Sequence, residues 1–436
     1  MSSNEFTLPR GMKDIEPDEM NRRLWLYDRI IQVVRRYGFQ LVEPTTIETL
    51  KTLEAKSGPA IRNEIYWFKD KGDRSLGLRF DLTVGLTRIV SNRSDLQEPI
   101  KYAAIGGNWR YDEPQYGRYR YFTQWDVEIF GSPSPLADAE VISIGAEILR
   151  NVGLKDFIIR ISNRKLIEAY LNQLGIRQGK KLEQSLRIID KIHKENRAQL
   201  EKEFATIKIS KQQISNIFTF VSLNGPPKTC LGKLKTVEFK DEKAKIAIAE
   251  LEVLADALDA FGLTSSCIYD LSIVRGIGYY DGIVFEAFDK AGDVGAIFGG
   301  GRYDQLCKVY GKRDLPGTGA AGGIERLMIS LESENLFPTP QPIAKVFIAT
   351  VKTDLKEHAI KLATQLRENE IAAIVDLKDR NLGKQIDYAN SAKIPYLIVL
   401  GQQELETRLV KIKNMATRTE TGASFDDLVS KIKVLD

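Results

Sequence analysis

Hydrophobic positions in the first fifty residues recur at helical spacing and then change to an extended run. Apolar side chains mark one face of a predicted helix within residues 9–48, namely Leu24, Leu26, Ile30, Ile31 and Val34. Gly38 follows, at the place where glycine commonly ends a helix, and residues 39–44 read as a strand. The pattern predicts a helix packed on a sheet.

Residues 107–131 show the period of two that is typical of half-buried strands. Apolar and aromatic side chains alternate with polar ones on both sides of a Pro-Gln-Tyr-Gly turn at 114–117. Tyr119 and Tyr121 come after the turn, followed by Trp125, Val127 and Ile129. The segment predicts a strand–turn–strand unit.

Arginines interleaved with aromatic residues surround this turn: Arg110, Arg118 and Arg120. A guanidinium group binds phosphate oxygens in a planar fork, and an aromatic such as Phe122 offers a face for a base. The unit can therefore bind a nucleotide. The same spacing also fits an exposed hairpin with a solvated basic edge, and spacing alone does not separate the two.

The later part of the chain divides into a helical segment, a proline-rich segment and an alternating segment. Residues 166–250 read as helical, with an irregular break at 223–227, and three prolines between 335 and 342 indicate a stiff linker. Beyond the linker, strands and helices alternate, with strands at 346–350, 371–375 and 396–400 and helices at 355–369 and 382–391. This alternation predicts a mainly parallel sheet covered by helices.

Composition narrows the class of protein without identifying it. The chain has 436 residues, 43% hydrophobic and 28% charged, which is ordinary for a globular protein of about two to four domains. No apolar run approaches the ~20 residues of a membrane span, and the first residues carry no apolar stretch of signal length. We expect a cytoplasmic protein.

Charge is unevenly distributed. The formal net charge is +4, but residues 163–250 hold 18 Lys and Arg against 10 Asp and Glu. A basic segment of this kind favours docking of nucleic acid, although a lysine-rich solvated helical surface has the same composition.

Cysteine and histidine are too sparse for metal or triad chemistry. Cys230, Cys267 and Cys307 lie far apart without a Cys-x-x-Cys pair, so neither a disulfide framework nor a zinc site is expected. The two histidines, His193 and His358, read as surface residues, which argues against a His-based metal site and a Ser-His-Asp triad.

In their order, residues 109–131 resemble motif 2 of the class II aminoacyl-tRNA synthetases, in the form used by histidyl-tRNA synthetases. The resemblance implies that Arg110 holds the α-phosphate of ATP, that Phe122 stacks on adenine and that Asp112 contacts the adenine amino group. It also implies that Gln124 and Glu128 line the amino-acid pocket.

The motif 2 loop departs from the family at one position. Glu113 stands where bacterial members usually carry arginine, so recognition of the tRNA acceptor end by this loop is open. The resemblance makes three loop residues candidate contacts of that end, Gln115, Arg118 and Arg120.

Residues 78–83 resemble the family segment that holds the α-amino group of histidine. Asp81 and Thr83 are two residues apart, so on a strand they point to one face and can accept hydrogen bonds from an ammonium group. Taken alone, an Asp-x-Thr sequence is more often a cap or a turn.

Residues 274–286 and 298–304 resemble the two signature peptides of histidyl-tRNA synthetases. By this resemblance Arg275 lies against the α-phosphate and stabilises the transition state. Tyr280 and Glu128 would each take one imidazole nitrogen, and a neutral imidazole needs one donor and one acceptor. Tyr279 and Tyr303 would complete the histidine pocket.

Two further segments extend the resemblance. Residues 319–327 look like motif 3, a small-residue strand running into a helix, whose arginine, Arg326 here, holds the far phosphates of ATP. The helix and strand before Pro44 resemble motif 1, which builds a homodimer interface in class II enzymes. The segment after the linker resembles an anticodon-binding domain, where Asp376, Arg380 and Lys384 are either anticodon contacts or ordinary loop charges.

Together these motifs imply an α+β class II catalytic domain, with an antiparallel sheet flanked by helices, a helical insertion and a C-terminal α/β anticodon-binding domain. The expected boundaries are 1–165 and 251–335 for the catalytic domain, 166–250 for the insertion, 336–342 for the linker and 343–436 for the anticodon-binding domain. The resemblance implies activation of L-histidine by ATP with Mg²⁺, without zinc, and transfer to tRNA(His) by a homodimer. The alternatives are a histidine-binding regulatory subunit and a tRNA-sensing module without ligase activity.

Overall fold

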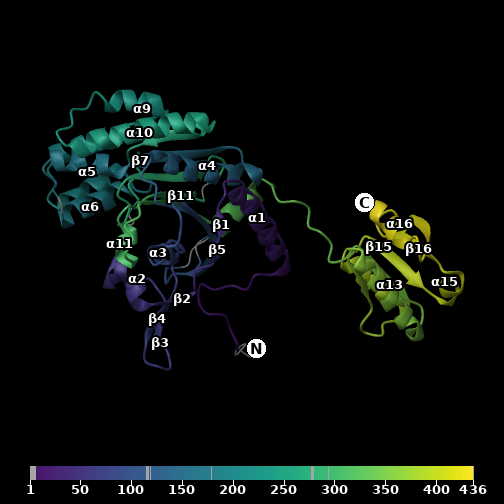
Figure 1. Cartoon of the computed structure of the whole chain (residues 1–436). Helices are drawn as coiled ribbons and strands as arrows, with labels where there is room; N and C mark the ends of the chain where they lie inside the picture. Colours follow the sequence, from purple (N-terminus) through teal and green to yellow (C-terminus); the bar gives the residue numbers. More distant parts are fainter. Residues whose placement is uncertain are drawn as a thin grey trace. The chain divides into compact units, whose positions relative to one another are not determined.

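The computed structural model describes residues 6–113, 117, 119–177, 179–275, 279–292 and 294–435. The chain divides into two compact units, and the division falls between Phe337 and Pro338 (Figure 1).

A nine-stranded sheet is the centre of the first unit. Its strand order is β1-β5-β6-β12-β11-β10-β7-β9-β8, and its pairs are antiparallel except β1 with β5 and β7 with β9. The strands span Gln40–Leu41 (β1), Ile100–Trp109 (β5), Tyr121–Phe130 (β6), Gly317–Gly323 (β12), Ala296–Arg302 (β11), Ile283–Asp289 (β10), Phe157–Asn163 (β7), Cys267–Asp270 (β9) and Asn224–Gly225 (β8). The two strands of the predicted strand–turn–strand unit are confirmed by β5 and β6, and residues 114–116 of its turn lie outside the described residues.

Helices and a small sheet cover the two faces of the large sheet. The helices α1 (Pro17–Arg36), α4 (Pro135–Asn151) and α12 (Ile324–Ser333) pack on one face. The other face carries α3 (Thr83–Ser91) and α11 (Leu306–Tyr310). Beside them lie α2 (Leu50–Ser57) and the antiparallel sheet of β2 (Ile47–Thr49), β4 (Ser75–Leu78) and β3 (Trp67–Lys69).

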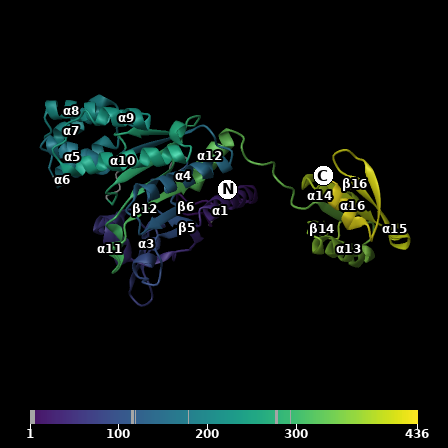
Figure 2. The ribbon, with the colours of Figure 1, turned by 45° about the horizontal axis from the view of Figure 1, so that its top comes forward.

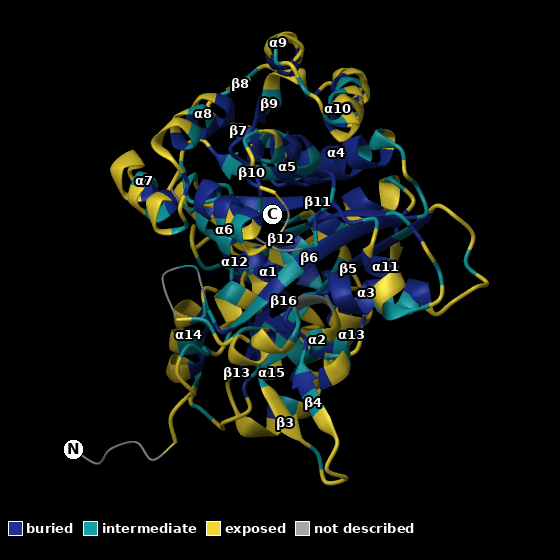
Figure 3. Cartoon of the chain, turned by 90° about the vertical axis from the view of Figure 1, so that its left-hand side faces the viewer, coloured by how far each residue is buried: buried dark blue, intermediate teal, exposed yellow. Residues whose placement is uncertain are grey.

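The period of two in β6 decides which side chains enter which layer. Trp125, Val127 and Ile129 are at most 2% exposed and join the core below α1 and α4. The polar residues at the alternate positions of β6, Gln124, Asp126 and Glu128, therefore point to the opposite face. The central strands of this sheet and α4 are buried along most of their length (Figure 3), whereas both residues of β1 are exposed.

The segment between β7 and β9 is helical. It contains α5 (Arg164–Gln173), α6 (Lys180–Ile189), α7 (Arg197–Thr206), α8 (Lys211–Val221), α9 (Pro227–Leu234) and α10 (Glu242–Ala260). These helices gather beside the large sheet (Figure 2). Their apolar side chains belong to the same buried cluster as α4, and α10 packs on α4.

A buried ion pair fastens α4 to the sheet. Arg302 of β11 donates to the carboxylate of Asp138, from Nη2 at 2.5 Å, and Thr318 of β12 donates to the same carboxylate at 2.7 Å. The side chain of Arg302 is 3% exposed and that of Asp138 is 0% exposed.

Replacing Asp138 by alanine is expected to lower the free energy of unfolding by about 3 to 5 kcal/mol, because the guanidinium of Arg302 stays buried without its main partner. Urea unfolding followed by tryptophan fluorescence measures the change. Asp95→Ala, which removes an exposed ion pair with Arg93, is the matched control and should leave the midpoint nearly unchanged. Equal midpoints for the two variants would contradict the role of Asp138.

The second unit is a five-stranded sheet with helices, in the order β14-β13-β15-β16-β17. Its strands are β13 (Val346–Thr350), β14 (Ala373–Val375), β15 (Tyr396–Leu400), β16 (Leu409–Asn414) and β17 (Glu420–Ser424). Its helices are α13 (Lys356–Glu368), α14 (Leu382–Ser391), α15 (Gln402–Thr407) and α16 (Leu428–Val434). β14, β13 and β15 are parallel as predicted, but β16 and β17 add an antiparallel hairpin that the sequence pattern did not indicate.

Three local predictions were wrong. Leu24 is 52% exposed and lies off the buried face of α1, which instead contains Arg23 and Val33. The strand predicted over residues 39–44 is reduced to Gln40–Leu41. The strand predicted to carry Asp81 and Thr83 ends at Leu78, and Thr83 is the first residue of α3.

Candidate active site

Two adjoining cavities lie on the polar face of β6. The smaller has a volume of about 110 Å³ and the larger about 410 Å³. Both are lined by the same boundary residues, Arg110, Gln124, Arg275, Gly299 and Ala321. The boundary between the two cavities therefore contains two arginines.

The smaller cavity gathers carboxyl and phenol groups that the sequence predicted for histidine binding. Glu128, which is 1% exposed, accepts a hydrogen bond from the hydroxyl of Tyr303. Tyr279 and Tyr280 complete one wall, and their hydroxyls lie 3.3 Å apart. Burial raises the pKa of Tyr303 well above its usual value, and the charge of Glu128 raises it further, so this phenol stays a neutral donor.

Asp81 and Thr83 reach the same cavity from the start of α3 rather than from a strand. One oxygen of Asp81 accepts a hydrogen bond from the backbone N–H of Val84 at 3.0 Å. Asp81 is therefore a capping residue that also lines the cavity, because a carboxylate at a helix start satisfies an unpaired N–H.

Glycines in β11 and β12 form the floor on which these side chains lie. A Cβ on Gly319 would meet Oε2 of Glu128 at 1.5 Å, and a Cβ on Gly299 would meet Nη1 of Arg275 at 2.0 Å. Real Cβ atoms do not approach other atoms so closely, so a side chain at Gly319 would press on Glu128 and on the backbone oxygen of Val127, and one at Gly299 would displace the tip of Arg275.

Gly319→Ala is expected to displace Glu128 and raise the half-saturating concentration of the ligand of the smaller cavity at least tenfold, because the backbone oxygen of Val127 at 2.8 Å leaves no direction for relief. Equilibrium dialysis of histidine measures it. Gly232→Ala, in α9 with nothing within 4 Å of the added Cβ, is the control. Equal binding by both variants would show that the floor is not restrictive.

The larger cavity begins at Arg110 and Phe122. Arg110 donates from Nε to the backbone oxygen of Phe80 at 2.9 Å, and its guanidinium carbon lies 4.9 Å from the centre of the Phe122 ring. Asn108 donates to Oε1 of Gln124 at 2.7 Å and so orients the Gln124 amide at the boundary. Asp112 also lines this cavity.

Arg275 enters between the two cavities with an unusual backbone conformation. Its φ is +47°, in the left-handed region that disfavours most side chains. Its Nη1 donates to the backbone oxygen of Phe285 at 3.2 Å, and its Nε lies 3.7 Å from Glu286. The guanidinium also lies 5.4 Å from the centre of the Tyr280 ring. These contacts hold the guanidinium at the boundary; strained backbone of this kind clusters at functional sites.

Arg326 and a buried network complete the larger cavity. Arg326, in the first turn of α12, donates from Nη1 to the backbone oxygen of Ala296 at 3.0 Å. Next to it Glu325 binds Arg23 of α1 at 2.9 Å and accepts from the backbone N–H of Thr123 at 3.0 Å. This network fixes the start of α12 against β6. It was not predicted from the sequence, because Arg23 and Glu325 are 302 positions apart and no local signal marks them.

The motif 2 loop is described only in part. Gln115 and Arg118 lie outside the described residues. Arg120 is 8% exposed, lies 4.0 Å from the Tyr111 ring centre and donates to the backbone oxygen of Asp112 at 3.0 Å. Glu113 is exposed and pairs with Arg10 at 2.9 Å. The burial of Arg120 favours a role in shaping the loop.

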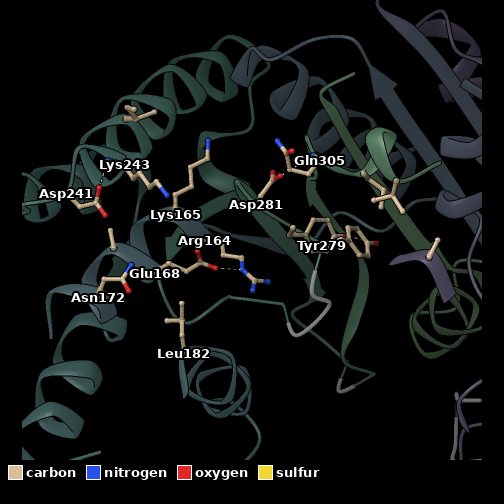
Figure 4. A pocket seen from close by; sticks show the side chains of 16 residues that line it. Arg164, Lys165, Glu168, Asn172, Leu182, Asp241, Lys243, Tyr279, Asp281 and Gln305 are labelled. Carbon is tan, nitrogen blue, oxygen red and sulfur yellow. Dashed lines mark hydrogen bonds and ion pairs between the residues drawn. The ribbon is translucent and has the colours of Figure 1, made fainter. Parts of the chain in front are cut away.

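A third cavity, of about 560 Å³, lies on the other side of Tyr279 and Tyr280. Figure 4 shows that α5 supplies Arg164 and Lys165, that Asp241 and Lys243 come from the start of α10, and that Gln305 and Asp281 lie near Tyr279. Arg164 binds Glu168 at 2.7 Å. Tyr279 and Tyr280 thus lie between the smaller cavity on β6 and this third cavity.

One histidine is more than a surface residue. His193 contacts Ser272 Oγ at 2.6 Å, next to Asp270, and Arg160 also contacts its ring at 3.2 Å. Because Ser272 donates its proton to Asp270 at 2.5 Å, this cluster is not arranged as a nucleophile and base. It links the helical segment to the end of β9.

In the part of the chain that the structure describes, no group of three or more His, Cys, Asp or Glu side chains is placed to hold a metal ion. Among the same residues no helix is both long enough and apolar enough to cross a membrane.

In the second unit, two of the three residues that are either anticodon contacts or ordinary loop charges pair with each other. Asp376 is 6% exposed and accepts from the side chain of Arg380 at 3.0 Å and from its backbone N–H at 2.9 Å. Lys384 is exposed, and its backbone N–H donates to Asn381 at the start of α14.

Comparison with known proteins covers almost the entire chain. Residues 11–327 match the family model of histidyl-tRNA synthetase, and residues 345–435 match that of an anticodon binding domain. A histidine–tRNA ligase of Pyrococcus horikoshii is 36% identical over 429 residues, which are 98% of this chain and 98% of that protein.

Solved structures agree with this result. The crystal structure of histidyl-tRNA synthetase from a Nostoc species superimposes with a TM-score of 0.84 at 28% identity and covers 99% of both chains. A Bacillus halodurans protein, described as an ATP phosphoribosyltransferase regulatory subunit/histidyl-tRNA synthetase, has a TM-score of 0.73 at 23% identity. The match covers 85% of this chain and 93% of the Bacillus halodurans chain, and at this identity it shows the shared fold alone.

Proposed function

The chain belongs to the histidyl-tRNA synthetase family, whose members are class II aminoacyl-tRNA synthetases, and its function is that of a histidine–tRNA ligase; we propose how its residues carry out the two steps of that reaction. The relatives match both units of the chain, so the regulatory-subunit alternative is not favoured.

The observation that carries the proposal is the boundary shared by the two cavities. The smaller cavity is the histidine site and the larger the ATP site, and Arg110 and Arg275 lie where they meet. The carboxylate of histidine and the α-phosphate of ATP both carry negative charge. Two guanidinium groups between them offset the repulsion and hold the reactants in line, which is the main requirement of phosphoryl-type transfer.

Recognition of histidine rests on its imidazole. Glu128 would accept from one ring nitrogen and Tyr280 would donate to the other, while Tyr303 fixes the Glu128 carboxylate. Tyr279 and Gln124 would complete the pocket, and Asp81 and Thr83 would hold the α-ammonium. An amino acid without both ring nitrogens leaves buried polar groups unpaired, which is a strong basis for rejection.

ATP would bind in the larger cavity. Phe122 would stack on adenine, Asp112 would contact the adenine amino group, and Arg326 would hold the far phosphates. Aminoacyl-tRNA synthetases generally use ATP with Mg²⁺. Glu286, which lines this cavity beside Arg275 and is not assigned to adenine, fits an ion held chiefly by phosphates and water. The ion would neutralise phosphate charge when bound.

In the first step the histidine carboxylate attacks the α-phosphorus, which gives histidyl-adenylate and pyrophosphate. In the second step the terminal ribose hydroxyl of tRNA attacks the adenylate carbonyl, the histidyl group is transferred and AMP leaves. The adenylate phosphate would accept the proton, so no side-chain base is needed. The acceptor end would approach the motif 2 loop that contains Gln115, Arg118 and Arg120.

Binding of tRNA(His) would use the second unit at the anticodon and the basic helical segment at the acceptor arm. We assign the catalytic domain to residues 1–165 and 251–335, the insertion to 166–250, the linker to 336–342 and the anticodon-binding domain to 343–436. The family's task in translation supports a cytoplasmic location.

A homodimer formed through α1 and β1 is part of the proposal. β1 is the first strand in the order of the large sheet, and apolar side chains are exposed on these two elements. Met20 is 38%, Leu24 52% and Leu41 41% exposed. A strand at the edge of a sheet, next to exposed apolar side chains, suits a second copy of the chain.

Transfer to tRNA tests the second step. With labelled histidine, ATP and Mg²⁺, we expect acid-precipitable label on a tRNA(His) transcript and none on a tRNA(Ala) transcript. Formation of histidyl-adenylate without label on either transcript would overturn the transfer step and favour a module that senses tRNA.

A further inference from the structure

Asp126 is a buried carboxylate in the histidine cavity that neither the motifs nor the proposed mechanism uses. It lies on β6 between Gln124 and Glu128, is 1% exposed and lines the cavity. Its Cα partners on the neighbouring strands are Ala104 and Ala321, whose small side chains leave the space above the sheet open.

The hydrogen bonds of Asp126 are incomplete. Oδ2 accepts from the hydroxyl of Thr83 at 3.3 Å, whereas Oδ1 is buried and has no hydrogen-bond partner among the described residues. A buried carboxylate oxygen without a donor is costly, and such a group in a binding cavity indicates that a ligand supplies the donor.

The surrounding charges indicate which donor is missing. Burial raises the pKa of Asp126 well above its usual value, the nearby carboxylates of Glu128 and Asp81 raise it further, and Thr83 and Arg110 act in the opposite direction. Tyr279, Tyr280 and Tyr303 also face the cavity as neutral phenols. A cation between Asp81 and Asp126 would relieve this repulsion.

We propose that Asp126 is a third ligand of the histidine α-ammonium, beside Asp81 and Thr83, and so determines the requirement for a charged amino group. The ammonium has three N–H donors. One oxygen of Asp81 is occupied by the N–H of Val84, which leaves the other for the ammonium. Because the Thr83 hydroxyl donates to Asp126, its lone pairs are free to accept the second N–H. The third N–H meets Oδ1 of Asp126.

This inference rests on the proposed function, since the ligand is histidine. It adds a carboxylate that acts directly on the substrate and orients Thr83. It also explains how a cavity with three carboxylates accepts an amino acid whose other charged end lies against two arginines.

The test compares two histidine analogues as competitive inhibitors of histidine-dependent ATP–pyrophosphate exchange at pH 7.5. L-Histidinol keeps the ammonium, and 4-(3-hydroxypropyl)imidazole lacks it. For Asp126→Asn we expect the inhibition constant of histidinol to rise by about 10- to 100-fold, as for loss of a charged hydrogen bond, with less than about a twofold change for the other analogue. Asp126→Ser serves in the same way if the asparagine variant does not fold.

A matched control is Asp289→Asn. Asp289 is a buried aspartate at the end of β10, outside the lining of both cavities, and its Oδ2 also lacks a hydrogen-bond partner among the described residues. It should leave both inhibition constants unchanged. Equal weakening of both analogues by Asp126→Asn would reduce Asp126 to a structural role, and unchanged constants would exclude the contact. Absence of exchange in the unaltered protein would instead count against the proposed function.

Discussion

Arg275→Ala is expected to reduce histidine-dependent ATP–pyrophosphate exchange by at least about 10³-fold, in the range found when an arginine that stabilises a phosphoryl-transfer transition state is removed. The reason is its position. Arg275 lines both cavities and is held there by the backbone oxygen of Phe285 and the carboxylate of Glu286. Binding of histidine alone should be nearly retained, because Asp81 and Glu128 remain.

Two further variants separate charge from shape. Arg275→Lys keeps a positive charge but loses the planar fork, so it should recover only part of the rate. Arg177→Ala removes an exposed arginine outside both cavities and should exchange normally. If Arg275→Ala exchanged pyrophosphate at the rate of the Arg177→Ala variant, Arg275 would have no part in the reaction.

Glu128→Gln is expected to raise KM for histidine about 10²-fold in the exchange reaction while KM for ATP stays within about twofold, because a charged hydrogen bond contributes about 1.5 to 3 kcal/mol. The glutamine keeps the shape of the side chain but turns an acceptor of two hydrogen bonds, from Tyr303 and from the imidazole, into a partly mismatched amide. Only KM for histidine is expected to change, because Glu128 lines the smaller cavity and not the larger one.

Glu147→Gln is the matched control for that variant. Glu147 also accepts a hydrogen bond from a tyrosine hydroxyl, that of Tyr37 at 2.8 Å, but lies on α4 away from both cavities. Its KM values should equal those of the unaltered protein. A Glu128 variant whose KM for histidine matched this control would rule out the imidazole contact.

The sequence predicted the elements whose signals are local. The period of two identified β5 and β6, and the small-residue run into Arg326 identified β12 and α12. The family match of both units confirms the expected fold class. These features depend on neighbouring residues, so a single chain carries enough information to find them.

Features with an ambiguous or weak local signal were not predicted in this way. Asp-x-Thr fits both a strand and a helix start, and the hydrogen bond from the backbone N–H of Val84 to Asp81 shows that the helix start is the one adopted. In the hairpin, β16 alternates buried Val410 and Ile412 with polar residues, but β17 has only one buried side chain, that of Ala423, so the second strand lacks a clear period of two. Asp126 resembles any polar residue between Trp125 and Val127 until α3 brings Thr83 against it.

The most direct test of the account is ATP–pyrophosphate exchange with each of the twenty standard amino acids in turn, with Mg²⁺ and without tRNA. We expect exchange with L-histidine and with no other amino acid, because one cavity recognises the imidazole and the other holds ATP. Exchange with a different amino acid would contradict the assignment of the smaller cavity. Exchange with none, in folded protein that still binds histidine, would contradict the ligase function itself.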